Sequence, residues 1–404
     1  MPIDLEVPKK FGPLVDQAHM VAVEILRPIS RKYDIAEHEY PKELDMLASL
    51  IDGLDEGGGA SGAGAAGASQ AIAEGETGNR NGSNMASVLS IIEMCWGDVG
   101  LLLTLPRQGL GNSAIAAVAD DDQKKRFAGK WAAMAITEPE AGSDSAAIRT
   151  TAVLDGDDYV LNGEKIYVTS GERAELVVVW ASLDREVGRA AIKSFVVERS
   201  NPGLKLDRLE HKLGIRASDT AAFILEDCRV PKEDLLGSPE IDTQKGFAGV
   251  MRTFDNTRPL VAGMALGVAR ACLEHTAEAL KEAGVEIDYD RPANSQHAAA
   301  AELLELESDF EAARLLTMEA AWMADNAKPN SLHASYAKAK AGRTGVDIAL
   351  RCIALCGSAG LGEQELLEKW ARDAKILDIF EGTQQIQLLI IARQLLGLTS
   401  AELK

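Results

Sequence analysis

The chain has 404 residues, 46% of them hydrophobic, and a formal net charge of −20 at pH 7. This length and apolar content are enough for a large core divided among two or three domains. The negative charge argues against a nucleic-acid groove or an anionic membrane surface as the main partner.

Membrane insertion and disulfide bonding are not expected. The chain has no stretch of about 20 apolar residues, and residues 1–6 lack a basic segment followed by an apolar one, so we expect a cytoplasmic protein with no membrane span. Five cysteines are an odd number in apolar surroundings, which is typical of reduced core thiols. Cys352 and Cys356 stand four apart, but no nearby histidine completes a ligand set, so no metal site is predicted.

The first part of the chain is predicted to be helical. Residues 8–50 show helical periodicity with breaks at Pro28 and Pro41, and a second helical block runs from about 83 to 128. Between them, residues 55–82 are rich in glycine and alanine and have too little apolar surface to offset the entropy of ordering, which predicts a mobile loop. Residues 1–132 therefore form the expected N-terminal helical domain.

Residues 133–236 have the pattern of a β domain. Short runs rich in β-branched and aromatic residues are bounded by Gly, Asn, Asp or Glu, which favours short strands. Three such runs are 159–161, 176–180 and 222–225.

The helical pattern returns in residues 237–404. Four long stretches lie at about 246–283, 295–326, 331–357 and 365–397, and glycine and proline fall mostly between them. Four long helices with short connections indicate a bundle. The order of helices, strands and helices predicts an α+β fold.

Two segments at the seams of this organisation carry the chemistry. In residues 134–144, Met-Ala-Ile-Thr-Glu-Pro-Glu-Ala-Gly-Ser-Asp, the hydroxyls of Thr137 and Ser143 and the nearby backbone amides can hydrogen-bond a flavin ring edge and a phosphate. Residues 379–383, Ile-Phe-Glu-Gly-Thr, place the carboxylate of Glu381 in an apolar setting. Each segment alone is an ordinary turn or helix start, but the pair predicts a flavin site.

These motifs resemble those of the acyl-CoA dehydrogenase family over nearly the whole chain. The resemblance implies that family's α+β fold, with an N-terminal α-helical domain, a central β domain and a C-terminal four-helix bundle. The shared motifs, in the family's order, are Thr-Glu-Pro-x-Ala-Gly-Ser-Asp at 137–144, Lys-x-Tyr-Val-Thr-Ser-Gly at 165–171, Lys-Leu-Gly-Ile-Arg-Ala-Ser-Asp-Thr at 212–220, Phe-Asp-Asn-Thr-Arg-Pro at 254–259, Arg-Asp-Ala-Lys at 372–375 and Glu-Gly-Thr at 381–383.

The resemblance also implies a reaction and a cofactor. An acyl-CoA thioester would be oxidised across its Cα–Cβ bond to the trans-2-enoyl-CoA, with FAD as the cofactor and an electron-transfer flavoprotein as the electron acceptor. By position in the shared motifs, the implied flavin-binding residues are Ile136, Thr137, Gly142, Ser143, Tyr167, Thr169, Thr383 and Gln385.

The base that takes the α-proton would be Glu381. A carboxylate in a closed, desolvated pocket has a raised pKa, which suits removal of a weakly acidic proton. Thr257 occupies the family's second location for the base, and a threonine hydroxyl cannot serve as a base at neutral pH. The residues implied to contact the acyl-CoA are Ser143, Asp255, Arg258 and Gly382.

The chain departs from the family where a neighbouring subunit would complete the flavin site. Glu286 and Ala354 stand where the family has an arginine and a glutamine, and Ser358 replaces the second glycine of the motif that contains the glutamine. An acidic residue in place of the arginine repels a pyrophosphate. We therefore expect a hetero-oligomer in which a homologous partner chain supplies both groups. The alternative is a homotetramer in which other residues, for instance Arg291 or Gln296, substitute.

The resemblance leaves the acyl group open, because the Gly/Ala-rich segment falls where the family builds part of its substrate-binding region. Straight fatty, branched and sterol side-chain thioesters all remain candidates. Two other functions are also open: a noncatalytic partner subunit of a hetero-oligomeric dehydrogenase, and a flavin monooxygenase on the same fold. The retained Glu381, Thr137 and Thr169 oppose the first, and a monooxygenase would not need the carboxylate of Glu381.

Overall fold

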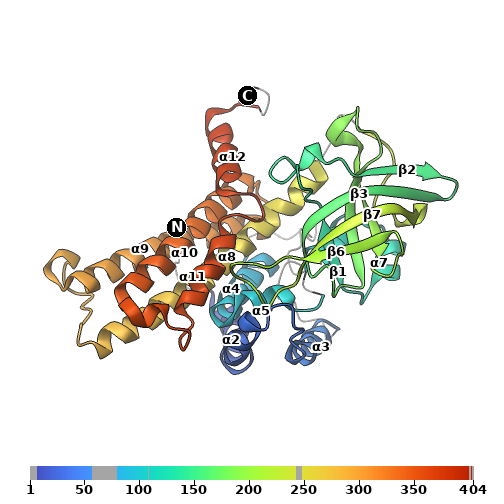
Figure 1. Ribbon diagram of the computed structural model, residues 1–404. Helices are drawn as coiled ribbons and strands as arrows, with labels where there is room; N and C mark the ends of the chain where they lie inside the picture. The colour runs from blue at the N-terminus through green and yellow to red at the C-terminus, as the bar shows by residue number, and fades with distance from the viewer. Residues whose placement is uncertain (1–6, 57–79, 108, 243–247, 400–401, 403–404) are drawn as a thin grey trace.

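The computed structural model describes residues 7–56, 80–107, 109–242, 248–399 and 402, and the side chains of 50–56 and 248–256 lie outside that description. Most helices from both ends of the chain gather on one side of the molecule and the strands lie on the other (Figure 1). Helices, strands and helices follow one another along the chain, which confirms the predicted α+β fold. Most of the predicted Gly/Ala-rich loop lies outside the described residues.

The first long helix runs through Pro28 without the predicted break. It consists of α1 (Gly12–Val21), the π-helical segment η2 (Ala22–Leu26) and α2 (Arg27–Ile35). Proline has no N–H to donate to the preceding turn, and a π-helical turn shifts the hydrogen-bond register directly before it. Pro41 separates α2 from α3 (Glu43–Glu56), as predicted.

The second helical block is divided into short helices. The first of them is buried along nearly its whole length and packs against α1 and the longest C-terminal helix. Asp98 ends it and caps the next helix by accepting a hydrogen bond from the Leu101 amide at 2.8 Å. These helices are α4 (Ser83–Gly97), α5 (Val99–Thr104), α6 (Leu110–Val118) and α7 (Asp121–Phe127).

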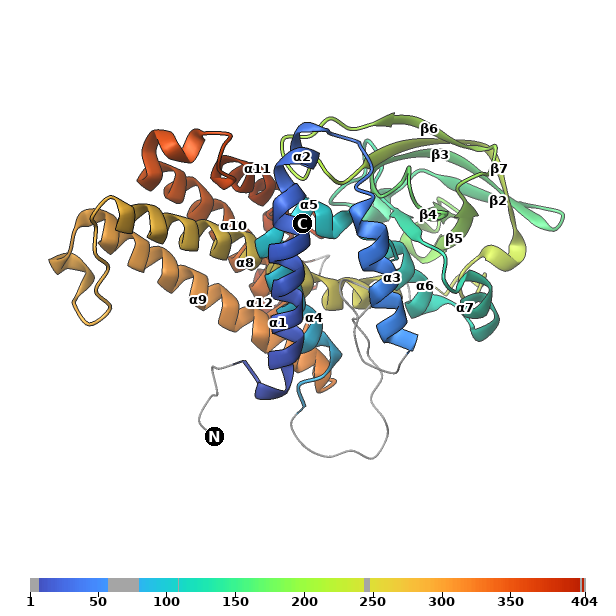
Figure 2. The same ribbon diagram turned by 90° about the horizontal axis from the view of Figure 1, so that it is seen from below.

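Seven strands form one mixed sheet, in the order β1-β4-β2-β3-β7-β6 with β5 paired to β4. β4 is parallel to β1 and β2, all its residues are buried, and α6 packs on β1 and β4 (Figure 2). The three predicted strand runs lie in β3, β4 and β7, so those predictions are confirmed. The strands are β1 (Ala132–Ala135), β2 (Thr151–Asp155), β3 (Asp158–Thr169), β4 (Leu176–Ser182), β5 (Ile192–Glu198), β6 (Leu204–Leu209) and β7 (Thr220–Pro231).

The described residues of the C-terminal part form three long α-helices and two shorter ones. The predicted stretch at 365–397 is two helices, because Glu381 and Gly382 adopt φ values of 54° and 90° that an α-helix cannot contain. The helices are α8 (Ala248–Glu282), α9 (Ala298–Asp325), α10 (Ser331–Cys356), α11 (Leu367–Leu377) and α12 (Gln384–Leu396).

Helices from the two ends of the chain share one core. A single apolar cluster joins α4 to α8, α9 and α10, and a second cluster lies within the sheet. All five cysteines are free thiols, four of them buried. The domain boundaries after residues 132 and 236 stay predictions.

One helix in the described part of the chain, α10 with the following turn to Leu361, is long and apolar enough to cross a membrane by length and composition alone. This helix packs against α8, α9, α11 and α12. Those contacts are typical of a core helix in a bundle.

Candidate functional site

The turn that follows β1 is fastened to β3. The Ile166 amide donates a hydrogen bond to the Thr137 carbonyl at 2.9 Å. Next to it, the ammonium of Lys165 and the carboxylate of Glu138 form a buried ion pair at 2.7 Å. These contacts hold the two predicted flavin-binding segments of the β domain side by side.

The carboxylate of Glu138 has partners on both oxygens. It accepts hydrogen bonds from the Thr150 amide at 3.0 Å, the Thr150 hydroxyl at 2.5 Å and the Arg149 amide at 2.5 Å. Burial acts to raise the pKa of Glu138, but Lys165 and these donors outweigh it and hold the pKa below its ordinary value. Burial lowers the pKa of Lys165 to about 8. A buried pair with satisfied hydrogen bonds keeps its geometry, so the turn has a fixed position.

Tyr167 presents an aromatic face at this turn. The register of β3 against β7 shifts between Lys165 and Val168, and Tyr167 adopts a φ of 58° within that irregularity. A bulge of this kind redirects a side chain, and the Tyr167 residue is 63% exposed. Thr169, the last residue of β3, is half-buried and pairs with Thr220 of β7.

The other predicted residues of the turn are open to a ligand. Ile136 and Thr137 are half-buried, whereas Gly142 and Ser143 are exposed. A β-carbon built at Gly142 would meet no atom within 4 Å, so the backbone there is free to be approached.

Glu381 lies in the turn between α11 and α12. The Thr257 hydroxyl, from α8, donates a hydrogen bond to its carboxylate at 2.9 Å. The side-chain amide of Gln387 donates to the carbonyls of Glu381 and Gly382 at 3.2 and 3.3 Å. A positive φ at a glutamate is strained, and such strain persists where surrounding contacts determine the conformation. These contacts hold the predicted base in one place.

Buried cations accompany this carboxylate. Burial raises the pKa of Glu381, and the hydrogen bond from Thr257 and the charges of Arg258 and Lys338 act in the opposite direction. Arg258 is 3% exposed and Lys338 is fully buried. The site therefore combines a desolvated carboxylate with two positive charges that favour its ionised form.

Lys338 is a site residue that the sequence reasoning missed. Burial lowers its pKa to about 8, and its Nζ makes no hydrogen bond within the described part of the chain. A signal for it exists, because Ala334, Ala341 and Gly345 place Lys338 on the buried stripe of α10. A lysine on such a stripe is rare unless it is paired or functional.

The predicted contacts to the acyl-CoA have mixed outcomes. Arg258 is buried near Glu381, and Gly382 adjoins it in the turn. Asp255 lies in α8, but its side chain is outside the described part. Ser143 belongs to the exposed turn of the β domain. The described contacts do not link these four residues to one another, so their role stays a prediction.

Thr383 and Gln385 lie at the start of α12. The Thr383 side chain caps the helix by accepting a hydrogen bond from the Ile386 amide at 3.3 Å, and Gln385 is exposed in the first turn. The Gln384 amide donates to the Asp378 carbonyl at 3.1 Å, so at this helix start the helix dipole and the exposed Gln385 are what favour a phosphate. An exposed aromatic face, an open glycine turn and this helix start are the features that FAD needs, so the residues present fit that cofactor.

Two positions at which the sequence departs from the family, 286 and 354, lie near the C-terminal ends of α8 and α10. Glu286 follows α8, Ala354 lies in the last turn of α10, and both are exposed. Arg291 and Gln296, the residues that could substitute for the missing arginine and glutamine, form hydrogen bonds within their own loop. Arg291 donates to the Ser295 carbonyl at 2.8 Å, and the Gln296 amide donates to the carbonyls of Asp288 and Arg291 at 2.8 and 3.0 Å.

Two family models match the chain. Residues 133–228 match the middle domain of acyl-CoA dehydrogenases, and residues 244–396 match their C-terminal domain. The first match includes the Thr137 turn and β3, and the second includes Thr257 and Glu381.

Individual proteins give the same result. The mitochondrial short-chain specific acyl-CoA dehydrogenase of Rattus norvegicus is 40% identical over 267 residues, which are 66% of this chain and 63% of the relative. The chain thus spans less than two thirds of that relative's length. A short-chain specific acyl-CoA dehydrogenase of Clostridium acetobutylicum is 32% identical over 325 residues, 78% of this chain and 84% of the relative. The structure of butyryl-CoA dehydrogenase from Megasphaera elsdenii superposes with a TM-score of 0.82 at 29% identity, covering 98% of this chain and 100% of that one.

Proposed function

The chain belongs to the acyl-CoA dehydrogenase family, and from this premise we propose that it oxidises an acyl-CoA thioester to the trans-2-enoyl-CoA. The observation that carries this proposal is the hydrogen bond from Thr257 to Glu381. It gives the one predicted base a fixed position, and it gives the threonine at the family's second base location a supporting role.

Glu381 would take the α-proton of the thioester. Burial raises its pKa toward that of the weakly acidic proton, and the cations of Arg258 and Lys338 keep enough of it ionised to act as a base. The Glu381 backbone amide would donate to the thioester oxygen and stabilise the enolate charge. Ser143, Asp255, Arg258 and Gly382 would contact the acyl-CoA.

FAD would bind between the β domain and the start of α12. The chemistry that FAD supplies when bound is acceptance of the β-hydride at N5. Tyr167 would pack on the ring and Thr169 would hydrogen-bond near N5. The remaining contacts are assigned to Ile136, Thr137, Gly142 and Ser143 on the flavin half and to Thr383 and Gln385 on the adenosine and phosphate half.

For the acyl group, the electron acceptor and the cellular location, we propose a class and not a single molecule or compartment. Relatives described as short-chain specific make butyryl-CoA the first thioester to test, and branched and sterol side-chain thioesters follow. An electron-transfer flavoprotein is the proposed acceptor. The rat relative is described as mitochondrial, so the cytoplasmic location of this chain stays a prediction.

Dye reduction by the flavin-loaded protein with an acyl-CoA panel tests the reaction. Glu381→Gln is expected to lower turnover at least about a thousandfold while the flavin stays bound, because the amide keeps the shape and loses the base. Unchanged turnover in this variant would show that the base is another residue.

We further propose that a homologous partner chain completes the flavin site. The exposed Glu286 and Ala354 support this, as does the local engagement of Arg291 and Gln296. Leucines of α12 that are 51–66% exposed offer apolar area for subunit contact: Leu388, Leu389, Leu395 and Leu396.

The same departures favour a second candidate function, a noncatalytic subunit of a hetero-oligomeric dehydrogenase. The ordered Glu381 with its Thr257 and Lys338 surroundings opposes it, and also opposes a flavin monooxygenase. The FAD-to-protein ratio of the chain alone and co-expressed with a homologue separates the assemblies. Flavin only in the co-expressed sample supports the hetero-oligomer, and one FAD per protomer in a homotetramer contradicts it.

A further inference from the structure

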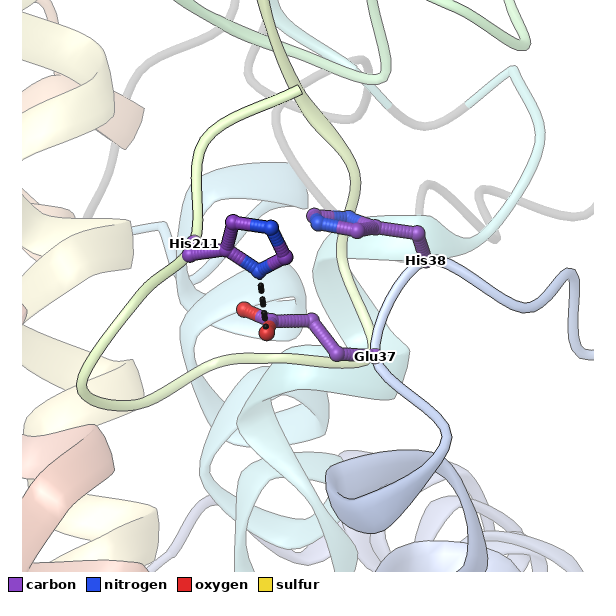
Figure 3. A group of neighbouring side chains, drawn as sticks. All are labelled: Glu37, His38 and His211. Atoms are coloured by element: carbon purple, nitrogen blue, oxygen red, sulfur yellow. Dashed lines mark hydrogen bonds and ion pairs between the residues drawn. The ribbon is translucent and has the colours of Figure 1, made fainter. Parts of the chain in front are cut away.

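Two histidines and a glutamate meet where the N-terminal helices touch the β domain. Glu37 and His38 lie two and three residues after the end of α2, and His211 lies two residues after the end of β6. Figure 3 shows the imidazole of His38 pointing toward the ring of His211, with the Glu37 carboxylate below both. None of the three takes part in the proposed reaction.

The spacing of their donor atoms suits one metal ion. One ligand atom from each of the three side chains lies within 4.8 Å of the other two. Nδ1 of His211 and Oε2 of Glu37 are 2.9 Å apart, and the two imidazole centroids are 5.1 Å apart. Two imidazoles that bind one ion with nitrogens about 2.1 Å from it at tetrahedral angles place their centroids about 5 Å apart. The rings are therefore already at the separation that a shared ion requires.

The imidazole ring of His38 lacks hydrogen-bond partners in the described part of the chain. Both ring nitrogens are buried and make no hydrogen bond within the described part of the chain. The residue is held at a φ of 73°, and its carbonyl accepts a hydrogen bond from Arg173 at 3.2 Å. Burying unpaired imidazole nitrogens costs free energy, and a metal ion would give one of them a partner.

The neighbouring cations are directed elsewhere. The Lys212 backbone amide donates to Oε1 of Glu37 at 2.8 Å, which orients the carboxylate and leaves Oε2 facing His211. The Lys212 ammonium donates to the Ser218 carbonyl at 2.6 Å, and Arg173 pairs with Asp219 at 3.4 Å. A positioned carboxylate with a separate hydrogen-bond donor is the arrangement that metal ligands have in proteins.

We propose that Glu37, His38 and His211 bind one divalent transition-metal ion, with Zn²⁺ the best match to a donor set of two imidazoles and a carboxylate. Water would complete the coordination. The ion would replace the proton shared by His211 and Glu37, and it would join the end of α2 to the loop after β6. That loop continues to Ile215, whose amide donates to Asp373 of α11 at 2.5 Å. The site would thus fasten the β domain to the helices.

The test is a Zn²⁺ titration of tag-free, chelator-treated full-length protein against a competing colorimetric chelator. Wild type is expected to bind one Zn²⁺ per chain, and His211→Asn and His38→Asn to bind it at least about tenfold more weakly. Asparagine tolerates a positive φ, so the His38 variant keeps its backbone. His211 is exposed, so replacing it leaves the core intact.

His19→Asn is the matched control. Nδ1 of His19 also lies 2.9 Å from a carboxylate oxygen, that of Glu93, but Arg270 donates to both Glu93 oxygens and no second histidine belongs to the pair. This variant is expected to bind Zn²⁺ as wild type does. Zn²⁺ should also raise the unfolding temperature of wild type and His19→Asn and leave that of His211→Asn unchanged. Equal Zn²⁺ affinity in wild type and His211→Asn would overturn the proposal and mark the binding as adventitious.

Discussion

The Thr257 hydroxyl donates a hydrogen bond to the Glu381 carboxylate at 2.9 Å, across 124 residues of sequence. One residue lies in α8 and the other in the turn between α11 and α12. The contact therefore joins α8 to the turn that holds the proposed base. A donor to the ionised carboxylate favours that form, so Thr257 would set the pH range in which Glu381, as the proposed base, is ionised.

Thr257→Val is expected to shift the pH profile of the reaction. Loss of the hydroxyl removes a group that lowers the pKa of Glu381, so that pKa rises. Because the base acts when ionised, the acidic limb of the kcat/KM profile should move to higher pH. Thr257→Ser keeps the hydroxyl and should leave the limb in place. An acidic limb at the same pH in the valine variant would mean that the hydrogen bond does not act on the base.

Lys338→Met is expected to stabilise the protein at neutral pH. The pKa of Lys338 is about 8 in the folded chain against 10.5 ordinarily, so the unfolded chain holds this proton more tightly. The cost of burying the charge is fully present below about pH 8 and disappears as pH rises to about 10.5, so stability rises with pH in this window. The cost at pH 7 is about 3 kcal/mol.

Urea unfolding of wild type and Lys338→Met at pH 7 and pH 10 measures this difference. The variant should be more stable at pH 7, with the gap narrowing at pH 10. Lys340→Met on the same helix is the control, because Lys340 is partly exposed and pairs with Asp309. In the pH profile, loss of Lys338 should also raise the pKa of Glu381, an effect that a purely structural lysine would not have. A Lys338 variant less stable than wild type at pH 7 would contradict the inference that burying the Lys338 charge lowers stability.

The sequence predicted the parts of the site that short motifs carry. Thr137 and Glu381 belong to short local motifs, and the resemblance of these motifs and of the Tyr167 segment to one family implied their roles. Lys338 was missed because, although Ala334, Ala341 and Gly345 lie on the same face of α10, small residues alone do not show that this face is buried until the packing is known. The contact from Thr257 was missed for the same reason, since it joins two distant segments.

The positions of helix breaks also depend on contacts that local sequence does not show. Pro28 predicted a break, but a π-helical turn accommodates the missing N–H. The turn at Glu381 was predicted as helix because its residues, apart from one glycine, allow helix formation. Its positive φ values accompany hydrogen bonds from Gln387 and Thr257, which periodicity cannot reveal.

Lys165→Met is expected to destabilise the β domain. Lys165 differs from Lys338, whose Nζ makes no hydrogen bond in the described part of the chain, because it forms a direct ion pair at 2.7 Å. The substitution therefore leaves the carboxylate of Glu138 buried without its cation, a change that costs about 3–5 kcal/mol. Flavin retention should fall as well, because the Thr137 turn loses one of its contacts to β3 and keeps only the backbone hydrogen bond from Ile166. Arg149→Met removes a partner from the exposed Arg149–Glu140 pair and should cost less than about 1 kcal/mol. Denaturant unfolding compares the free energies of unfolding of the two variants. Similar losses in both would show that the buried pair contributes no more to stability than the exposed pair.

The last prediction concerns the residues that the chain lacks. If Glu286 and Ala354 stand where a partner must supply arginine and glutamine, the double variant Glu286→Arg/Ala354→Gln should let the chain complete a second copy of itself. The FAD-to-protein ratio of the chain expressed alone is expected to rise from near zero toward one, because a cation replaces an anion beside the pyrophosphate. Glu282→Arg makes the same charge change at the exposed end of α8 and should not raise the ratio. Full flavin in the unaltered chain alone would show instead that other residues already fill these roles.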